Sequence, residues 1–245
     1  MRKHPIFGKC RLCHQHKRLV DSHIIPDFQF KPLKKKDGFF YRVSTDPKKK
    51  VIKQQKGITE HLLCATCDNE RLQKNETHLS RVVFGIHSLD LSRVGRIVPV
   101  PGYDYKKVKN ALLSILWRMS ISSRPDFRDI DLGAKHEEAI RLALLNDTVF
   151  AEEQYPILLT APLLQGQFYK DLIVGPDYAR FGSNRVYRCL ISGLVFTFIV
   201  GSAPLDGKAK PFILRQKTWP LVVAKVEEIP FLYDTFFKLS RAKGI

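Results

Sequence analysis

The chain has 245 residues, and its 41 Lys and Arg outnumber its 24 Asp and Glu, which gives a formal charge of +17. Hydrophobic residues make up 44% of the chain, so it can form a folded core and is not disordered throughout. The longest apolar run, residues 194–200, is far shorter than the roughly 20 residues of a membrane-spanning helix. The basic residues at the start are not followed by the apolar segment of a secretory signal. We therefore expect a cytoplasmic protein without a membrane partner, whose charge favours a polyanion.

The positive charge is concentrated in the first third of the chain. Residues 1–80 carry 18 basic and 8 acidic side chains, a net charge of +10, and the densest basic stretch is residues 31–56. Lysine and arginine side chains suit contacts with phosphate groups, and such contacts weaken steeply with salt. The aromatic residues among them, Phe39, Phe40 and Tyr41, are expected either to stack on bases or to form the core of a hairpin. The residues predicted to bind nucleic acid are Lys34, Lys35, Lys36, Arg42, Lys48, Lys49, Lys50, Lys53 and Lys56.

Four of the five cysteines form two Cys-x-x-Cys pairs. These are Cys10, Cys13, Cys64 and Cys67. Two such turns can place four thiolates around one ion, so they predict a tetrahedral structural zinc site, whereas disulfides are a poor alternative inside a cell. His14 and His16 lie near the first pair and are possible substitute ligands. The fifth cysteine, Cys189, lies in an apolar segment and is expected to be a core residue.

The segments next to the cysteine pairs contain candidate catalytic residues. Residues 19–25 are predicted to form a short apolar strand that carries His23 and ends at Pro26. Residues 68–85 are predicted to form a helix directly after the second pair. At about 100° per residue, Asn69 lies within about 40° of Glu76 on this helix, whereas Asp68 lies about 80° from Glu76. A strand histidine can therefore face polar and acidic groups on the first turns of a helix.

This arrangement resembles the HNH, or ββα-metal, endonucleases of the zinc-bound treble-clef type. The resemblance rests on the order Cys-x-x-Cys, Ser-His-Ile-Ile-Pro, Leu-Leu-Cys-x-x-Cys-Asp, and it covers about residues 8–80, a third of the chain. Some proteins with this pattern are associated with antiviral defence. The resemblance implies an endonuclease acting on nucleic acid, in the first place double-stranded DNA. It also implies a defence effector that works beside a sensor or ATPase subunit, or as a homo-oligomer.

The resemblance further implies roles for individual residues. His23 matches the general base that deprotonates the attacking water, and an imidazole can take a proton near neutral pH. Asp68 matches the helix residue that binds one catalytic Mg²⁺ or Mn²⁺ ion. The family has an acidic residue directly before the histidine, where this chain has Ser22. Glu76 and Asn69 are therefore further catalytic candidates that would supply the missing metal ligands.

Ser22 leaves a second interpretation open, in which the protein binds nucleic acid through a zinc finger but does not cleave it. Asp21 does not fill the gap, because neighbouring residues of a strand point to opposite faces. In this interpretation His23 is a packed strand residue, Asp68 is a first-turn acid favoured by the helix dipole, and Glu76 is solvent-exposed. A third interpretation is a protein–protein adaptor whose charge serves an acidic partner or solubility.

The rest of the chain contains no motif that specifies a chemistry. Helices are predicted at residues 105–120 and 135–146, after a turn-rich connection over residues 86–104. Strands are predicted at residues 156–161, 171–175, 184–192, 194–202 and 219–225, and an aromatic helix at residues 230–242. Ser192 and Gly193 are predicted to form the turn between the two strongest strands.

The predicted fold class is α+β, with two parts. Residues 1–86 are expected to form a zinc-bound treble-clef, or ββα-metal, nuclease module. Residues 87–245 are expected to form an α+β domain with a mainly antiparallel sheet, which serves substrate positioning, oligomerisation or docking of a partner.

Overall fold

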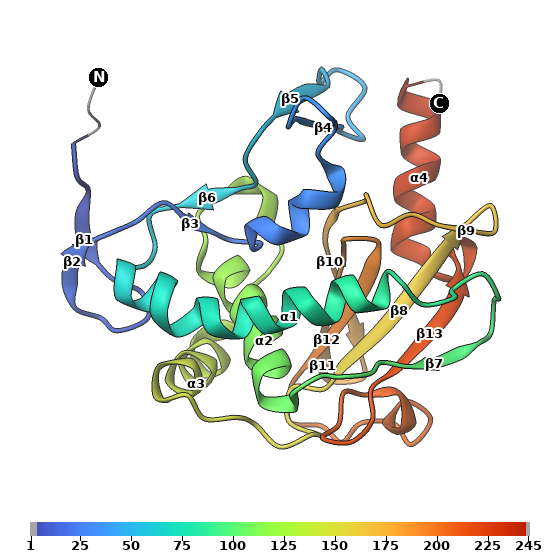
Figure 1. Ribbon diagram of the computed structural model, residues 1–245. Helices are drawn as coiled ribbons and strands as arrows, with labels where there is room; N and C mark the ends of the chain where they lie inside the picture. Colours follow the sequence, from blue (N-terminus) through green and yellow to red (C-terminus); the bar gives the residue numbers. More distant parts are fainter. Residues whose placement is uncertain (1–3, 244–245) are drawn as a thin grey trace.

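The computed structural model describes residues 4–243, and it is an α+β structure built on one large sheet (Figure 1). Seven strands follow the order β10-β11-β12-β8-β13-β7, with β9 paired to β8. Of the described pairs, only β8 with β13 is parallel, which confirms the predicted mainly antiparallel sheet. The strands are β7 (Ile97–Pro99), β8 (Ile157–Leu164), β9 (Gln167–Phe168), β10 (Val174–Phe181), β11 (Asn184–Ile191), β12 (Leu194–Val200) and β13 (Pro220–Lys225).

Alternate residues of a strand point to opposite sides of the sheet. Both sides are covered, since residues from each of them are buried in a hydrophobic core. On β11, Tyr187 and Cys189 belong to the main core, whereas Leu190 belongs to a smaller core with Leu232 of the last helix. Cys189 is buried, in agreement with its predicted core role. The predicted turn between β11 and β12 is also present, with left-handed backbone angles at both of its residues.

The α-helices of the described residues are α1 (Gln73–Ile86), α2 (Tyr105–Ile121), α3 (Gly133–Asn146) and α4 (Pro230–Lys243). Helix α2 is buried along most of its length, since apolar residues occupy nearly all of its sides, and it packs against both α1 and α3. Asp104 caps its first turn by accepting a hydrogen bond from the backbone N–H of Lys107 at 3.0 Å. The bounds of α2, α3 and α4 confirm the helices predicted after residue 100, with small shifts at their ends.

The N-terminal part consists of small strand pairs and short helices that precede α1 in the chain. β1 (Phe7–Lys9) pairs with β2 (His16–Arg18), β3 (Ser22–His23) with β6 (Thr59–Glu60), and β4 (Phe40–Arg42) with β5 (Ile52–Gln54). The 3₁₀ helix η1 (Asp27–Leu33) follows β3, and the π-helix η2 (Thr66–Leu72) continues directly into α1. The strand predicted at residues 19–25 is shorter than expected, because only Ser22 and His23 pair with β6, and Leu19 forms a separate bridge to Cys64.

Two predictions for the second part are wrong in detail. Residues 86–104 are not only a connection, since they include β7, which pairs with β13 at the edge of the sheet. An edge position tolerates Pro99, whose missing N–H would break the hydrogen bonds of a central strand. The strand predicted at residues 171–175 begins at Val174 and runs to Phe181, with an irregular register between Val174 and Asp177.

One hydrophobic core extends through both parts of the chain. It joins Leu63 and Leu79 from the N-terminal part to Leu112, Leu116 and Phe196 from the part with the large sheet. The predicted boundary after residue 86 coincides with the end of α1, but the core continues across it. Among the described residues, no helix is both long enough and apolar enough to cross a membrane.

Candidate functional site

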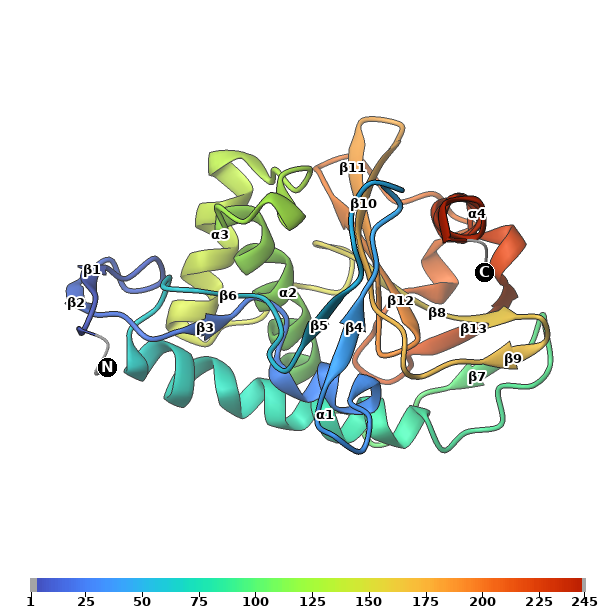
Figure 2. The same cartoon turned by 90° about the horizontal axis from the view of Figure 1, so that it is seen from above.

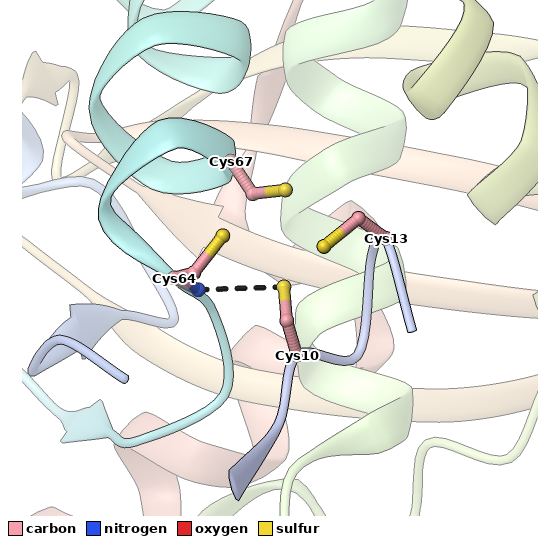
Figure 3. Close-up of side chains that lie close together, drawn as sticks. All are labelled: Cys10, Cys13, Cys64 and Cys67. Carbon is pink, nitrogen blue, oxygen red and sulfur yellow. Dashed lines mark hydrogen bonds between the residues drawn. The ribbon is translucent and has the colours of Figure 1, made fainter. Parts of the chain in front are cut away.

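The four cysteine thiols of the two Cys-x-x-Cys pairs converge on one point (Figure 3). Cys10 and Cys13 lie in the turn between β1 and β2, and Cys64 and Cys67 lie where η2 begins. Their four Sγ atoms are within 4.8 Å of one another. Such a set of soft donors suits a tetrahedral metal site, so this cluster could hold a metal ion such as zinc.

Hydrogen bonds hold the thiols in place without any ion. The backbone N–H of Cys64 donates to Cys10 Sγ at 3.3 Å, and the backbone N–H of His14 donates to the carbonyl of Cys10 at 2.8 Å. The hydrogen bond between the Cys10 and Cys67 side chains lowers the pKa of Cys10 to about 4 and raises the pKa of Cys67. The low pKa of Cys10 favours its thiolate form, which is the form that binds a metal ion.

A cavity of about 360 Å³ lies at the other candidate site, around His23. Residues of five elements meet there, from β3, η1, η2, α1 and α2. All four predicted catalytic residues line it, although they come from two segments more than 40 residues apart in the chain. The polar residues that line the cavity are His23, Asp27, Lys31, Asp68, Asn69, Gln73, Glu76, Thr77, Ser80 and Arg118.

The β3–β6 pair places His23 at the edge of this cavity. His23 pairs with Thr59 and Ser22 with Glu60. The carboxylate of Glu60 accepts hydrogen bonds from the hydroxyl groups of Ser122 and Ser123 just after α2, at 2.5 and 2.7 Å. The strand that carries the histidine is thus tied to the end of the central helix.

The π-helix brings Asp68 to the cavity. The backbone N–H of Gln73 donates to the carbonyl of Asp68, five residues earlier, so this turn holds one residue more than an α-helical turn. An ideal α-helix would place Asp68 about 80° from Glu76, whereas the wider turn rotates it toward the Glu76 face. Asp68 and Glu76 consequently line the same cavity.

The surroundings of Asp68 shift the pKa of its carboxyl group. Burial raises its pKa; Arg118 and His23 oppose this effect, and the negative charge of Glu76 adds to it. The nearby hydroxyl of Ser22 also lowers the pKa of Asp68, but the buried Oγ makes no hydrogen bond of ordinary geometry. Ser22 therefore lies beside Asp68, in the position where the resemblance leads one to expect an acid.

Glu76 is engaged in a buried ion pair with Arg118 of α2. The side chain of Arg118 is 1% exposed and that of Glu76 is 17% exposed. The same guanidinium donates to the carbonyl of His23 at 2.6 Å and to the carbonyl of Ser114 at 3.2 Å. Within residues 4–243, the four cysteines are the one group of three or more His, Cys, Asp or Glu side chains that converge as metal ligands do.

Sequence reasoning missed Arg118 and Asp27 among the residues that line the cavity. A signal was present for Arg118, because a charged residue between Trp117 and Met119 on a buried helix must find hydrogen-bond acceptors. No comparable signal marks Asp27, whose place depends on the turn that follows β3.

The predicted nucleic-acid-binding residues lie on the β4–β5 hairpin and the segments that flank it. Figure 1 shows this hairpin projecting away from the sheet, and the view from above (Figure 2) shows it extending from the side of α1 toward β10 and β11. Phe40 is buried and packs on Phe30 with ring centroids 5.3 Å apart, so it belongs to the hairpin core. Tyr41 is 46% exposed and lies under the ammonium group of Lys35.

Several of these cations already have acidic neighbours. Lys53 pairs with Asp37 at 2.9 Å, and Arg42 pairs with Asp126 beyond α2. Lys34 lies 3.6 Å from Asp27, which lines the cavity. The basic stretch therefore begins at the cavity and continues along the hairpin.

Comparison of the chain with protein-family models, with curated proteins and with solved structures finds no match.

Proposed function

We propose that the chain is an HNH-like, metal-dependent endonuclease that hydrolyses nucleic acid at the cavity around His23. The observation that supports this most is that His23 of a short antiparallel strand pair and Asp68 of the following helix line one cavity. That helix begins at the second cysteine pair. In the proposal the four cysteines bind a structural zinc ion, and residues 1–86 form a treble-clef module around it.

The residues at the cavity fit the proposed chemistry. His23 takes the proton of the attacking water, which is the role of a general base. Asp68 and the amide oxygen of Asn69 would hold the Mg²⁺ or Mn²⁺ ion, since both offer hard oxygen ligands and Mg²⁺ often needs only one or two carboxylates. When bound, the ion supplies positive charge that stabilises the phosphate undergoing attack. Arg118 donates a hydrogen bond to the backbone of His23 and forms an ion pair with Glu76. Glu76 thus helps to hold Arg118 in the position from which it binds the His23 backbone.

The substrate is proposed to be double-stranded DNA, bound through the basic hairpin. The hairpin and its flanks carry the densest positive charge of the chain, and they begin at residues that contact the cavity. Phosphate groups held along the hairpin would place a neighbouring phosphodiester at His23. The proposal further includes a cytoplasmic location and an effector role in antiviral defence, beside a sensor or ATPase subunit or as a homo-oligomer.

Two observations favour a second candidate function, which is binding of nucleic acid without cleavage. Glu76 is paired with Arg118, and Ser22 stands where the resemblance leads one to expect an acid. Asp68 is then the one predicted carboxylate that remains available to a metal ion at the cavity.

A cleavage assay separates the two candidates. Purified protein is incubated with supercoiled plasmid in Mg²⁺ or Mn²⁺, with EDTA as the control, and with single-stranded DNA and RNA in parallel. Nicking that depends on the divalent ion supports the nuclease. A gel shift without nicking supports the second candidate, and the absence of both rules out both.

A further inference from the structure

The imidazole of His23 has one enclosed nitrogen. Its Nε2 atom is buried and has no hydrogen-bond partner in the described chain. The side chain as a whole is nevertheless 30% exposed. The exposed part of the side chain therefore lies at its other atoms, and Nδ1 is not among the buried polar atoms without a partner in the described chain.

The carboxylate of Asp27 lies close to the enclosed nitrogen. Its Oδ1 atom lies 3.8 Å from His23 Nε2, and both residues line the cavity. Pro26 explains this proximity, because its extended backbone (φ −52°, ψ 140°) ends β3 and starts η1 at Asp27. An acid four residues after the histidine is thereby brought back to face it.

Two other acids, Glu76 and Asp68, and a lysine, Lys31, also line the cavity. Glu76 is bound by Arg118, and Asp68 lies beside Ser22. Lys34 Nζ is 3.6 Å from the same Asp27 oxygen that faces His23. Within the described part of the chain, Asp27 is the one acid within 4.0 Å of a His23 ring nitrogen.

We propose that Asp27 is a positioning residue for His23. Its carboxylate accepts a hydrogen bond from Nε2–H, which holds the neutral ring in one tautomer and leaves the lone pair of Nδ1 free. Nδ1 is then the atom that takes the proton from water. The separation of 3.8 Å closes by a small rotation of the Asp27 side chain, and such bonds are often long before a substrate is bound. The reaction in which His23 acts rests on the proposed function, whereas the tautomer of the His23 ring does not.

The test reads the tautomer directly from the full-length protein by ¹⁵N NMR of the histidine rings. Spectra are recorded at about pH 8.5, where an ordinary imidazole is neutral, and the His23 signals are assigned with His23→Gln. We expect the Nε2–H tautomer in the wild type and in Asp27→Glu, and a mixture of both tautomers in Asp27→Ala. The matched control is Asp21→Ala, which removes an exposed acid from the residue before β3 and is expected to leave the tautomer unchanged.

Two results would overturn the proposal: a wild-type His23 protonated on Nδ1, or the same tautomer ratio in Asp27→Ala and the wild type. If Asp27→Ala does not fold, the wild-type spectrum alone still decides, because Nδ1–H would rule out the bond. If the protein cleaves nucleic acid, Asp27→Ala is expected to lower kcat by about 10- to 100-fold with KM unchanged. A wild type without nuclease activity contradicts the proposed function, whereas the NMR result stands independently of it.

Discussion

Arg118 donates a hydrogen bond to the backbone carbonyl of His23 at 2.6 Å, so a side chain from the central helix α2 fixes the strand residue at the candidate site. The same guanidinium pairs with Glu76 of α1 and is almost completely buried. The guanidinium of Arg118 therefore connects three elements, β3, α1 and α2. The part of the chain after residue 86 thus helps to build the cavity, since without α2 neither the strand nor Glu76 would have this partner.

Replacing Arg118 by Met should destabilise the protein by about 3–5 kcal/mol, because it leaves the mostly buried carboxylate of Glu76 and the carbonyl of His23 without their partner. Urea unfolding followed by circular dichroism measures this change. The double variant Arg118→Met/Glu76→Gln should recover part of the loss, since it no longer buries an unpaired charge. A loss below about 1 kcal/mol for the single variant would show that the pair does not matter for stability.

Replacing Cys64 by Ser should remove the bound metal. The four Sγ atoms form one cluster, and the loss of one thiolate weakens a tetrahedral zinc site severely. Elemental analysis of the purified protein should find about one zinc per wild-type chain and much less in the variant. Cys189→Ala is the matched control, because Cys189 is buried in the sheet away from the cluster and its loss should leave the zinc content unchanged.

Replacing Lys48 and Lys50 by Gln should weaken the salt dependence of DNA binding. Each lost phosphate contact reduces the slope of log K against log salt by about 0.9. Fluorescence anisotropy with a labelled duplex across a salt series measures this slope. Lys208→Gln/Lys217→Gln removes the same charge from exposed positions in the loop between β12 and β13, on the opposite side of the molecule from the hairpin in Figure 1. An equal effect of both pairs would show that net charge, and not the hairpin, governs binding.

The buried ammonium group of Lys109 makes stability depend on pH. Lys109 Nζ is enclosed on α2, where it donates to the carbonyl of Ala151 at 2.7 Å and contacts the hydroxyl of Tyr105 at 2.9 Å. Burial lowers its pKa from 10.5 to about 7, so the unfolded chain binds more protons than the folded one between these values. The free energy of unfolding should therefore rise as the pH increases from 7 toward 10.5, and fall in the opposite direction.

Chemical denaturation of the wild type and of Lys109→Met at a series of pH values from about 7 to 9 tests this expectation. The difference between the two proteins isolates Lys109 from other titrating groups, such as the thiols of the unfolded chain. The wild type should gain stability relative to the variant with increasing pH. A difference that stays constant would contradict the lowered pKa.

Parts of the cysteine cluster and of the cavity could be predicted from the sequence, because the motifs that carry them are local. Each Cys-x-x-Cys turn orients its own two thiols, and Asp68 directly follows Cys67. His23 precedes a proline that ends its strand, so its position on a short strand was also a local property. The sequence likewise indicated helix α2 and the β11–β12 turn, where periodicity and a Ser-Gly pair act over a few residues.

The rest of the site depends on contacts between distant segments. Arg118 and His23 are separated by 95 residues, and only the packing of α2 on α1 brings them together. The π-turn that rotates Asp68 toward the cavity cannot be predicted from angles that assume an ideal α-helix. Asp27 reaches His23 through the turn at Pro26 and not through strand or helix periodicity. These are the features for which tertiary structure overrides local pattern.

The most direct test of the central claim is metal-dependent plasmid cleavage by the wild type, by His23→Ala and by His61→Ala, which removes an exposed histidine just after β6. A general base contributes about 10²- to 10⁴-fold to a rate, so His23→Ala should lower the cleavage rate within this range while zinc content and DNA affinity stay unchanged. His61→Ala should cleave like the wild type, and EDTA should stop both. Equal cleavage by the wild type and His23→Ala would contradict the assignment of the base, and no cleavage by either would contradict the proposed nuclease.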